Sequence, residues 1–235
     1  MSKPFVIVEA LFQGLTQLDF TGPHTVFSRL PGVEVIVASP LGGSVVSDGG
    51  LTFAGTICLP AVDRCDLLFV PGGVAVTDAI EDPAFLDQIR RLAQGARYLT
   101  SVCNGSLALG AAGLLKGRRA ACHWAWRDML ELFGAIPDPG RVVRDGDVIT
   151  GGGVTAGIDF ALVVAAELAG EATAQALQLA LEYAPAPPFD AGRPETAPPA
   201  VLAEVQARMD AILPARWEAA RRAAAGLRDH FVGET

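Results

Sequence analysis

Charge is scarce in this chain, and positive charge is scarcer than negative. Asp, Glu, Lys and Arg make up 19% of the 235 residues, and the net charge at pH 7 is −8. Proteins that bind nucleic acid neutralise phosphates with clustered Lys and Arg. The densest basic segment, RWEAARR, is mixed with Glu218. The composition therefore predicts no nucleic-acid partner.

The chain also lacks an apolar run that could cross a membrane. The stretch YLTSVCNGSLALGAAGLL (residues 98–115) is uncharged, but Thr, Ser, Asn and Gly interrupt it. A membrane helix needs about 20 mainly apolar residues. The first residues, MSKPFVIVEALF, have neither the long apolar centre nor the cleavage site of a signal peptide. We therefore expect a cytoplasmic protein without membrane contact.

Cysteine is rare and shows no metal-binding pattern. The four cysteines are Cys58, Cys65, Cys103 and Cys122. They form no CxxC pair and no ligand spacing with histidine. In a cytosolic chain of this size we expect reduced thiols, and we expect no metal.

Strand-like runs alternate with segments of helical periodicity, which predicts an α/β fold with a parallel sheet covered by helices on both faces. The predicted strands are 5–8, 33–39, 65–71, 97–102 and 118–124, with hairpins at 44–55 and 141–150. The predicted helices are 21–30, 82–93, 104–115, 125–134, 155–170 and 173–183. The first of these helices is expected to have Thr21 as its cap and Pro23 in its first turn.

The C-terminal part differs in composition from the rest of the chain. Residues 184–199, APAPPFDAGRPETAPP, contain six prolines, which predicts an extended surface arm. The next helix carries an apolar stripe and is expected to end or kink at Pro214. The stripe consists of Leu202, Val205, Met209 and Ile212. We therefore predict one domain over residues 1–199 and a helical extension over 200–235.

Three features follow predicted strands, where open parallel sheets bind ligands. Asp19 follows the first strand, Gly72-Gly73 follows the third and Cys103 follows the fourth. A cysteine at a strand-to-helix bend is exposed to the helix amino end, which lowers a thiol pKa and favours the nucleophilic thiolate. Gly105 allows the backbone to crowd at this bend. The alternative, an inert buried cysteine, is preferred for the other three cysteines.

A catalytic thiol needs a group that transfers protons, and Asp19 is the candidate. Beside a thiolate its pKa would rise, so it could hold a proton. The alternative is a loop carboxylate that steadies a helix start. His24, His123 and His230 were weighed for the same role, and His123 fits better as a packed surface residue. The Gly72-Gly73 N–H groups could stabilise negative charge on a substrate, unless this is an ordinary turn.

The segment GGGVTAG (residues 151–157) matches the dinucleotide pattern G-x-G-x-x-A only superficially. The strand before it belongs to a hairpin, and Glu171 lies in a helical stretch and not at a strand end. We therefore reject a nicotinamide cofactor. The glycines are expected to let the next helix approach the sheet near Cys103.

Several motifs together resemble the isocyanide hydratases of the PfpI-like superfamily. They are QLDFTGP, VPGG, TSVCNGSLALGAAGLL, HWAW, TGGGVTAGIDFAL and LEYAPAPPF, between Phe5 and Pro199. The resemblance implies the class I glutamine amidotransferase-like fold, a flavodoxin-like three-layer sandwich with a nucleophile elbow. It also implies a homodimeric lyase that adds water to an isocyanide and releases an N-substituted formamide, with no cofactor.

The same resemblance assigns roles to residues. Cys103 falls on the nucleophile and Asp19 on the general acid/base. The residues implied to lie around the substrate are Gly72, Gly73, Asn104, Gly152 and Val154. The hydratases usually have threonine after the cysteine, and Asn104 offers an amide that could bind the thiolate instead. Small, apolar surroundings are expected to suit an apolar isocyanide substituent.

Two other functions remain open at this point. The chain could be a glyoxalase-like or redox-responsive relative that uses Cys103 without isocyanides. It could also be a non-catalytic dimeric binding module whose cysteine is incidental. A peptidase is disfavoured because Asn104 replaces the histidine that would follow the cysteine. A regulator is disfavoured because about 35 residues after Pro199 are too few for a helix-turn-helix module.

Overall fold

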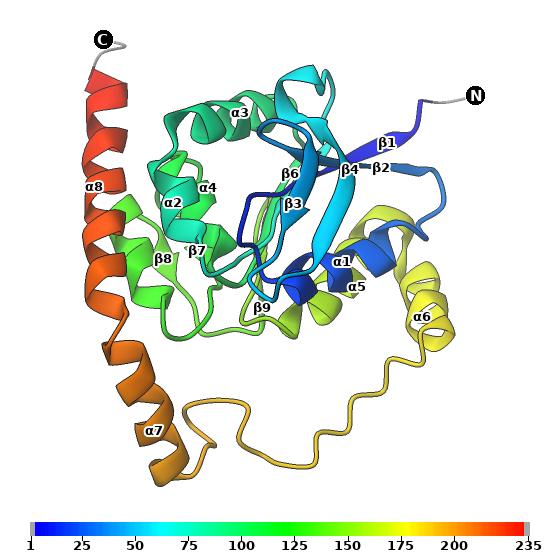
Figure 1. Cartoon of the computed structure of the whole chain (residues 1–235). Coiled ribbons are helices and arrows are strands. Elements are labelled where there is room, and N and C mark those ends of the chain that lie inside the picture. Colours follow the sequence, from blue (N-terminus) through cyan, green and yellow to red (C-terminus); the bar gives the residue numbers. More distant parts are fainter. Residues whose placement is uncertain (1–2, 233–235) are drawn as a thin grey trace.

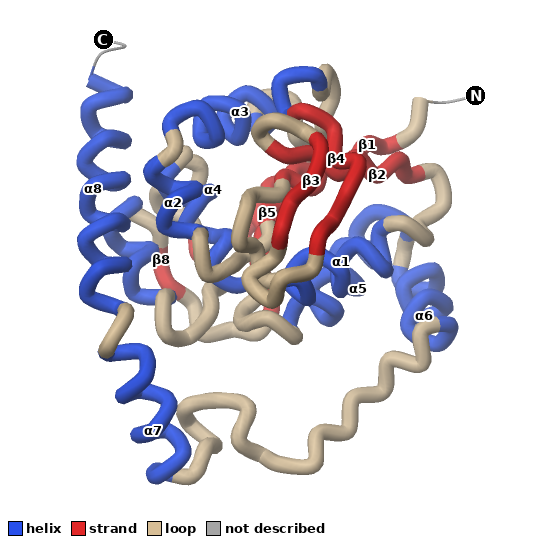
Figure 2. Tube along the Cα trace, in the orientation of Figure 1, coloured by secondary structure: helices blue, strands red, loops and turns tan. Residues whose placement is uncertain are grey.

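A computed structural model describes residues 3–232, with side chains described for residues 3–227. One eight-stranded sheet, of order β3-β4-β2-β1-β5-β6-β10-β9, forms its centre (Figures 1 and 2). The strands are β1 (Phe5–Ala10), β2 (Val33–Ser39), β3 (Gly43–Val46), β4 (Thr52–Cys58), β5 (Leu67–Val70), β6 (Tyr98–Val102), β9 (Val142–Asp145) and β10 (Val148–Gly151), with β7 (Arg119–Ala120) and β8 (Ile136–Pro137) paired apart from it.

The sheet is parallel except at its two edges. Strands β4-β2-β1-β5-β6-β10 pair in parallel, while β3 and β9 pair antiparallel to β4 and β10. Both edge pairs are hairpins, as predicted from SDGG and from Asp145-Gly146. The central strands β5 and β6 are buried throughout, because helices cover both of their faces.

Helices cover both faces of the sheet, and the predicted α/β sandwich is confirmed. The helices are α1 (Gln17–Phe27), α2 (Val76–Glu81), α3 (Pro83–Ala93), α4 (Ser106–Ala111), α5 (Ala156–Ala169), α6 (Glu171–Ala180), α7 (Pro199–Asp210) and α8 (Leu213–Val232). One apolar core joins α1 and α5 to the sheet, with Phe27, Phe69 and Phe160 in mutual ring contact. The other core lies under α2, α3, α4 and α8.

The helix α1 begins earlier than predicted. It starts at Gln17, so Thr21 and Pro23 both lie inside it and Asp19 lies in its first turn. Proline inside a helix removes one backbone hydrogen bond and costs about 3 kcal/mol. Pro23 packs closely against α5, which offsets this cost. The close contact is possible because residue 157 is glycine: a Cβ there would lie only 3.1 Å from the Pro23 ring. The predicted loop position of Asp19 is therefore wrong.

Three other predicted elements are shorter or tighter than expected. Residues 103–115 form a 3-10 turn followed by the short helix α4, and Arg127–Phe133 form a 3-10 helix instead of an α-helix. Only Arg119–Ala120 of the predicted strand at 118–124 is extended, and it lies outside the main sheet. Leu107, Leu109 and the Met129-Leu130 pair are fully buried all the same, so packing and not backbone regularity holds this region.

The proline-rich arm is extended, as predicted, and leads away from α6 to α7 (Figure 1). The helix α7 has no buried residue, whereas α8 packs on the body through Trp217, Ala220 and Ala224. Pro214 occupies the first turn of α8, where a missing N–H costs little. The helical segment is interrupted just before it, between Asp210 and Leu213. No helix between residues 3 and 232 is both long and apolar enough to cross a membrane.

Candidate active site

Cys103 stands at a strained bend directly after β6. Its φ is 59°, in the left-handed region that costs a non-glycine residue about 1–2 kcal/mol. The bend is held by its N–H, which donates to the Gly152 carbonyl at 2.7 Å. Gly105 is required here, because a Cβ on it would lie 2.4 Å from the Val70 carbonyl oxygen. The predicted sharp strand-to-helix turn is therefore present.

Asp19 reaches the same point from α1. A Cβ added to Gly72 would lie 2.7 Å from Asp19 Oδ2 and 2.8 Å from Cys103 Cβ. Both residues therefore pack against the side of Gly72 that carries no side chain, called below the bare face of Gly72. Asp19 is fully buried and Cys103 is 5% exposed. Neither Asp19 oxygen has a partner of good hydrogen-bond geometry within the described residues. A buried carboxyl group without a committed partner is available for proton transfer.

Burial determines the protonation of this pair. Loss of hydration raises the pKa of Asp19 to about 7, and the thiol of Cys103 and the N–H of Gly72 lower it only in part. Burial and the neighbouring Asp19 also raise the pKa of the Cys103 thiol well above its ordinary value. The expected lowering of the thiol pKa by the helix amino end is wrong, because desolvation outweighs it. The raised pKa of Cys103 favours the neutral thiol, beside the buried Asp19 carboxyl group.

Asn104 does not turn its amide to the sulfur. Its Oδ1 accepts the Gly73 N–H at 2.8 Å and its Nδ2 donates to the Gly73 carbonyl at 3.1 Å. This corrects two expectations. Asn104 supports the turn at Gly73 instead of binding the thiolate, and the Gly73 N–H is bonded to Asn104 and so is not free to bind a substrate. Gly73 is further pressed against Leu15. Of the pair, only the Gly72 N–H interacts with the Asp19 carboxyl group.

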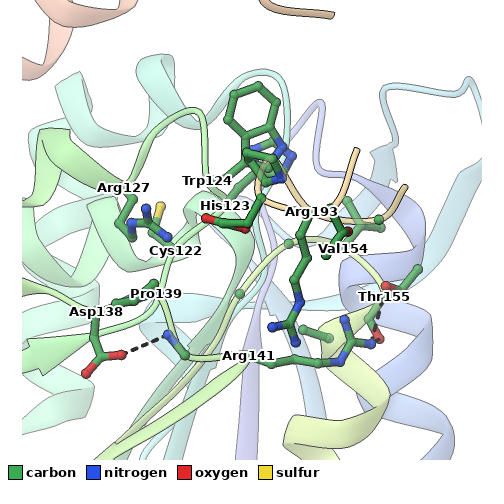
Figure 3. Close-up of a pocket in the computed structure, with 18 residues that line it drawn as sticks. Cys122, His123, Trp124, Arg127, Asp138, Pro139, Arg141, Val154, Thr155 and Arg193 are labelled. Atoms are coloured by element: carbon green, nitrogen blue, oxygen red, sulfur yellow. Dashed lines mark hydrogen bonds between the residues drawn. The ribbon is translucent and has the colours of Figure 1, made fainter. Parts of the chain in front are cut away.

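Gly152 and Val154 lie beside the cysteine on the segment between β10 and α5. Gly152 is tied on both sides, since its carbonyl accepts from Cys103 and its N–H donates to the Arg141 carbonyl at 2.8 Å. Val154 is half-buried and lines a cavity of about 720 Å³ next to the elbow (Figure 3). The glycines of 151–153 thus bring α5 close to Cys103, as expected.

The cavity has charged residues in its wall. Besides Cys122, His123 and Trp124, its wall includes Arg127, Arg141 and the arm residues 192–196. The expectation of small, apolar surroundings concerns Cys103, which lies in an apolar cluster and does not line this cavity. Nothing in the local sequence indicates the cavity, because the arm reaches it only through the tertiary fold.

The described histidine side chains do not join the Cys103–Asp19 pair. His24 Nδ1 lies 2.7 Å from Glu9 Oε2, and the fully buried Glu9 has a pKa raised by burial. His123 lines the cavity, and burial lowers its pKa. The side chain of His230 lies outside the described residues. The Glu9–His24 pair was not anticipated, although a glutamate inside a β-rich run is a usable signal of a buried polar contact.

Comparison with known proteins gives a consistent result. An isonitrile hydratase from Pseudomonas putida is 52% identical over 217 residues, which cover 92% of this chain and 95% of that protein. A ThiJ/PfpI family protein from Pseudomonas syringae matches with a TM-score of 0.87 at 41% identity, over 94% of this chain and 90% of the other. DJ-1beta from Drosophila melanogaster matches with a TM-score of 0.70 at 25% identity, over 77% of this chain and 100% of the other.

The family assignment agrees with the fold and with the elbow. The model of the DJ-1/PfpI family matches residues 6–167, which include β1 from Val6 on, Asp19, the Gly72-Gly73 turn, Cys103 and α5 up to Glu167. This chain belongs to the DJ-1/PfpI family.

Proposed function

We propose that this protein is a lyase that hydrates isonitriles (isocyanides) to N-substituted formamides, with Cys103 as nucleophile and Asp19 as acid/base. The observation that carries the proposal is the buried Cys103–Asp19 pair on the bare face of Gly72. The 52% identity to a Pseudomonas putida isonitrile hydratase, over nearly the full length of both chains, supports the reaction class.

The first half of the reaction forms a thioimidate. Asp19 takes the thiol proton of Cys103, and the sulfur attacks the terminal carbon of R–NC. Asp19 then delivers that proton to the same carbon, which gives R–N=CH–S–Cys103. A carboxyl group with a pKa of about 7 exchanges protons readily at neutral pH, as this step requires.

The second half releases the product. Ionised Asp19 removes a proton from water, whose oxygen attacks the thioimidate carbon, and Asp19 then passes that proton to the nitrogen to give R–NH–CH(OH)–S–Cys103. Asp19 next takes the hydroxyl proton, for transfer to the leaving sulfur. The C–S bond then breaks, the formamide R–NH–CHO leaves and the thiol is restored. The Gly72 N–H, which interacts with Asp19, is the backbone donor for negative charge that develops at this site.

Gly72→Ala is expected to reduce turnover at least about 100-fold, since its Cβ would lie 2.5 Å from Asn104 Oδ1 and 2.7 Å from Asp19 Oδ2. Steady-state kinetics with a neutral isonitrile measure the effect. Gly95→Ala is the matched control, because its Cβ would meet only the Cys65 carbonyl, at 3.6 Å. Wild-type kinetics in Gly72→Ala would contradict the assigned geometry.

The functional assignment is tested by product analysis. Purified protein and cyclohexyl isocyanide should yield N-cyclohexylformamide, identified by mass spectrometry, with one oxygen derived from labelled water. Glyoxal consumption and peroxide sensitivity are measured in parallel, because a glyoxalase-like or redox-responsive protein would respond there instead. Absence of any formamide from a panel of isonitriles would refute the proposal.

The proposal includes a homodimer in the cytoplasm. Leu179 on α6 and Phe189 on the arm are 82% and 79% exposed, which leaves apolar surface for a second copy. The four free thiols suit a reducing compartment. Light scattering coupled to gel filtration should give twice the chain mass of 24.4 kDa. A monomer at micromolar concentration would contradict the dimer, and Leu179→Glu with Phe189→Glu should weaken it.

A further inference from the structure

The cavity adjoins the elbow through Gly152. Gly152 forms part of its wall and accepts the backbone N–H of Cys103. Cys122, another wall residue, lies near enough for its thiol to affect the pKa of the Cys103 thiol. With the isonitrile carbon at Cys103, the substituent on nitrogen therefore has this space of about 720 Å³ to occupy.

The cavity holds more positive charge than its own carboxylates neutralise. Arg141 is paired with Asp159 at 2.6 Å, and Asp138 with Arg119 at 2.9 Å. Among the described side chains, Arg127 and Arg193 form no ion pair, nor does the exposed Glu195 on the same arm. The two unpaired guanidinium groups outnumber the one unpaired carboxylate, so the net charge of the cavity lining is positive.

The orientation of Arg193 is informative. Its segment could have turned this exposed side chain to solvent, yet Figure 3 shows it pointing from the arm into the cavity. Arg127 enters from the opposite segment, close enough to lower the pKa of the Cys122 thiol. Guanidinium groups suit a planar carboxylate, which they bind through paired N–H donors.

His123 supplies a neutral donor to the same wall. Its Nδ1 accepts the N–H of Ala125 at 3.2 Å, so in the neutral ring the proton is on Nε2. Burial lowers the pKa of His123 and keeps the ring neutral. Nε2 lies on the side of Gly153, where a Cβ would be 3.8 Å away. The ring therefore offers an N–H without adding charge.

We infer that the preferred substrates are isonitriles whose substituent carries a carboxylate, bound in this cavity by Arg193 and Arg127. The inference rests on the proposed hydratase function and specifies its substrate class. The arm 184–198 thereby becomes a specificity element, since it brings Arg193 to a site otherwise built by β10, α5 and residues 122–127. A neutral isonitrile still reacts at Cys103 but lacks this attraction.

A matched substrate pair tests the inference: 3-isocyanopropanoate and its methyl ester, with formamide formation followed for both. Wild-type kcat/KM should favour the carboxylate by about 10-fold or more, mainly through KM, and the preference should weaken as salt is raised. Arg193→Gln should lower the carboxylate-to-ester ratio about 10-fold. Arg193→Lys should recover part of it. Arg208→Gln, at an exposed arginine of α7, is the control and should keep the wild-type ratio.

The outcomes separate the two proposals. The inference fails, and the hydratase function stands, if wild type hydrates the ester and the carboxylate with equal kcat/KM. It also fails if Arg193→Gln and Arg208→Gln give equal carboxylate-to-ester ratios. If neither compound nor cyclohexyl isocyanide yields a formamide, the function fails and the inference fails with it.

Discussion

Cys103→Ala should abolish formamide production, with a loss on the order of 10³-fold or more, because no thioimidate can form without the sulfur. The fold should persist, since alanine keeps the Cβ and meets the same backbone constraint at φ 59°. The backbone N–H at this position still donates to the Gly152 carbonyl. Steady-state kinetics, circular dichroism and thermal unfolding together separate lost chemistry from lost structure.

The matched control is another cysteine. Cys58→Ala removes a half-buried thiol at the end of β4, whose sulfur lies 3.3 Å from the Pro40 carbonyl, and it should retain wild-type turnover. In wild type, iodoacetamide should block turnover in step with alkylation of Cys103, mapped by peptide mass spectrometry. Formamide production at the wild-type rate in folded Cys103→Ala would show that the sulfur is not the nucleophile.

The elbow could be predicted because its cause is local. A β-branched run followed by Cys-Asn-Gly indicates a strand that ends in a tight turn. The hairpin at Asp145-Gly146 and the cap at Asp82 followed for the same reason. Asp82 indeed accepts the Ala84 N–H at 2.9 Å.

The partners of the elbow could not be predicted, because they depend on contacts distant in sequence. Asn104 and Gly73 are 31 residues apart, and only the folded sheet brings their amides together. Arg193 is placed by an arm whose composition predicts extension but no destination. Local patterns therefore indicated the candidate residues, and tertiary packing decided which of them meet.

The thiol pKa shows how a local argument can give the wrong sign. The turn after Cys103 does supply the Asn104 backbone N–H, which lowers the thiol pKa. Complete burial acts in the opposite direction and is the larger effect. Burial depends on α1, α5 and the Gly72 turn together, so the residues around position 103 do not reveal it.

Asp19→Asn should lower kcat by about 10²- to 10⁴-fold, because asparagine fits the site but can neither accept the thiol proton nor activate water. In wild type, kcat/KM should fall as the pH drops below about 7, where Asp19 becomes protonated and cannot deprotonate the thiol. The variant should lose this acidic limb. An unchanged rate, or an acidic limb that persists in Asp19→Asn, would exclude Asp19 as the proton-transfer group.

The same substitution should stabilise the protein, and this second effect distinguishes a functional carboxyl group from a structural one. Because folding raises the pKa of Asp19 from 3.8 to about 7, its ionisation opposes folding above pH 7, by up to about 4 kcal/mol. This penalty shrinks as the pH falls from 7 and is gone below 3.8. Urea unfolding should therefore show Asp19→Asn more stable than wild type at pH 8, with the gap narrowing by pH 5. Asp87→Asn, on the exposed side of α3, is the control and should show no such gap. A variant less stable than wild type at pH 8 would mean that Asp19 holds the fold together, and that its burial serves structure before chemistry.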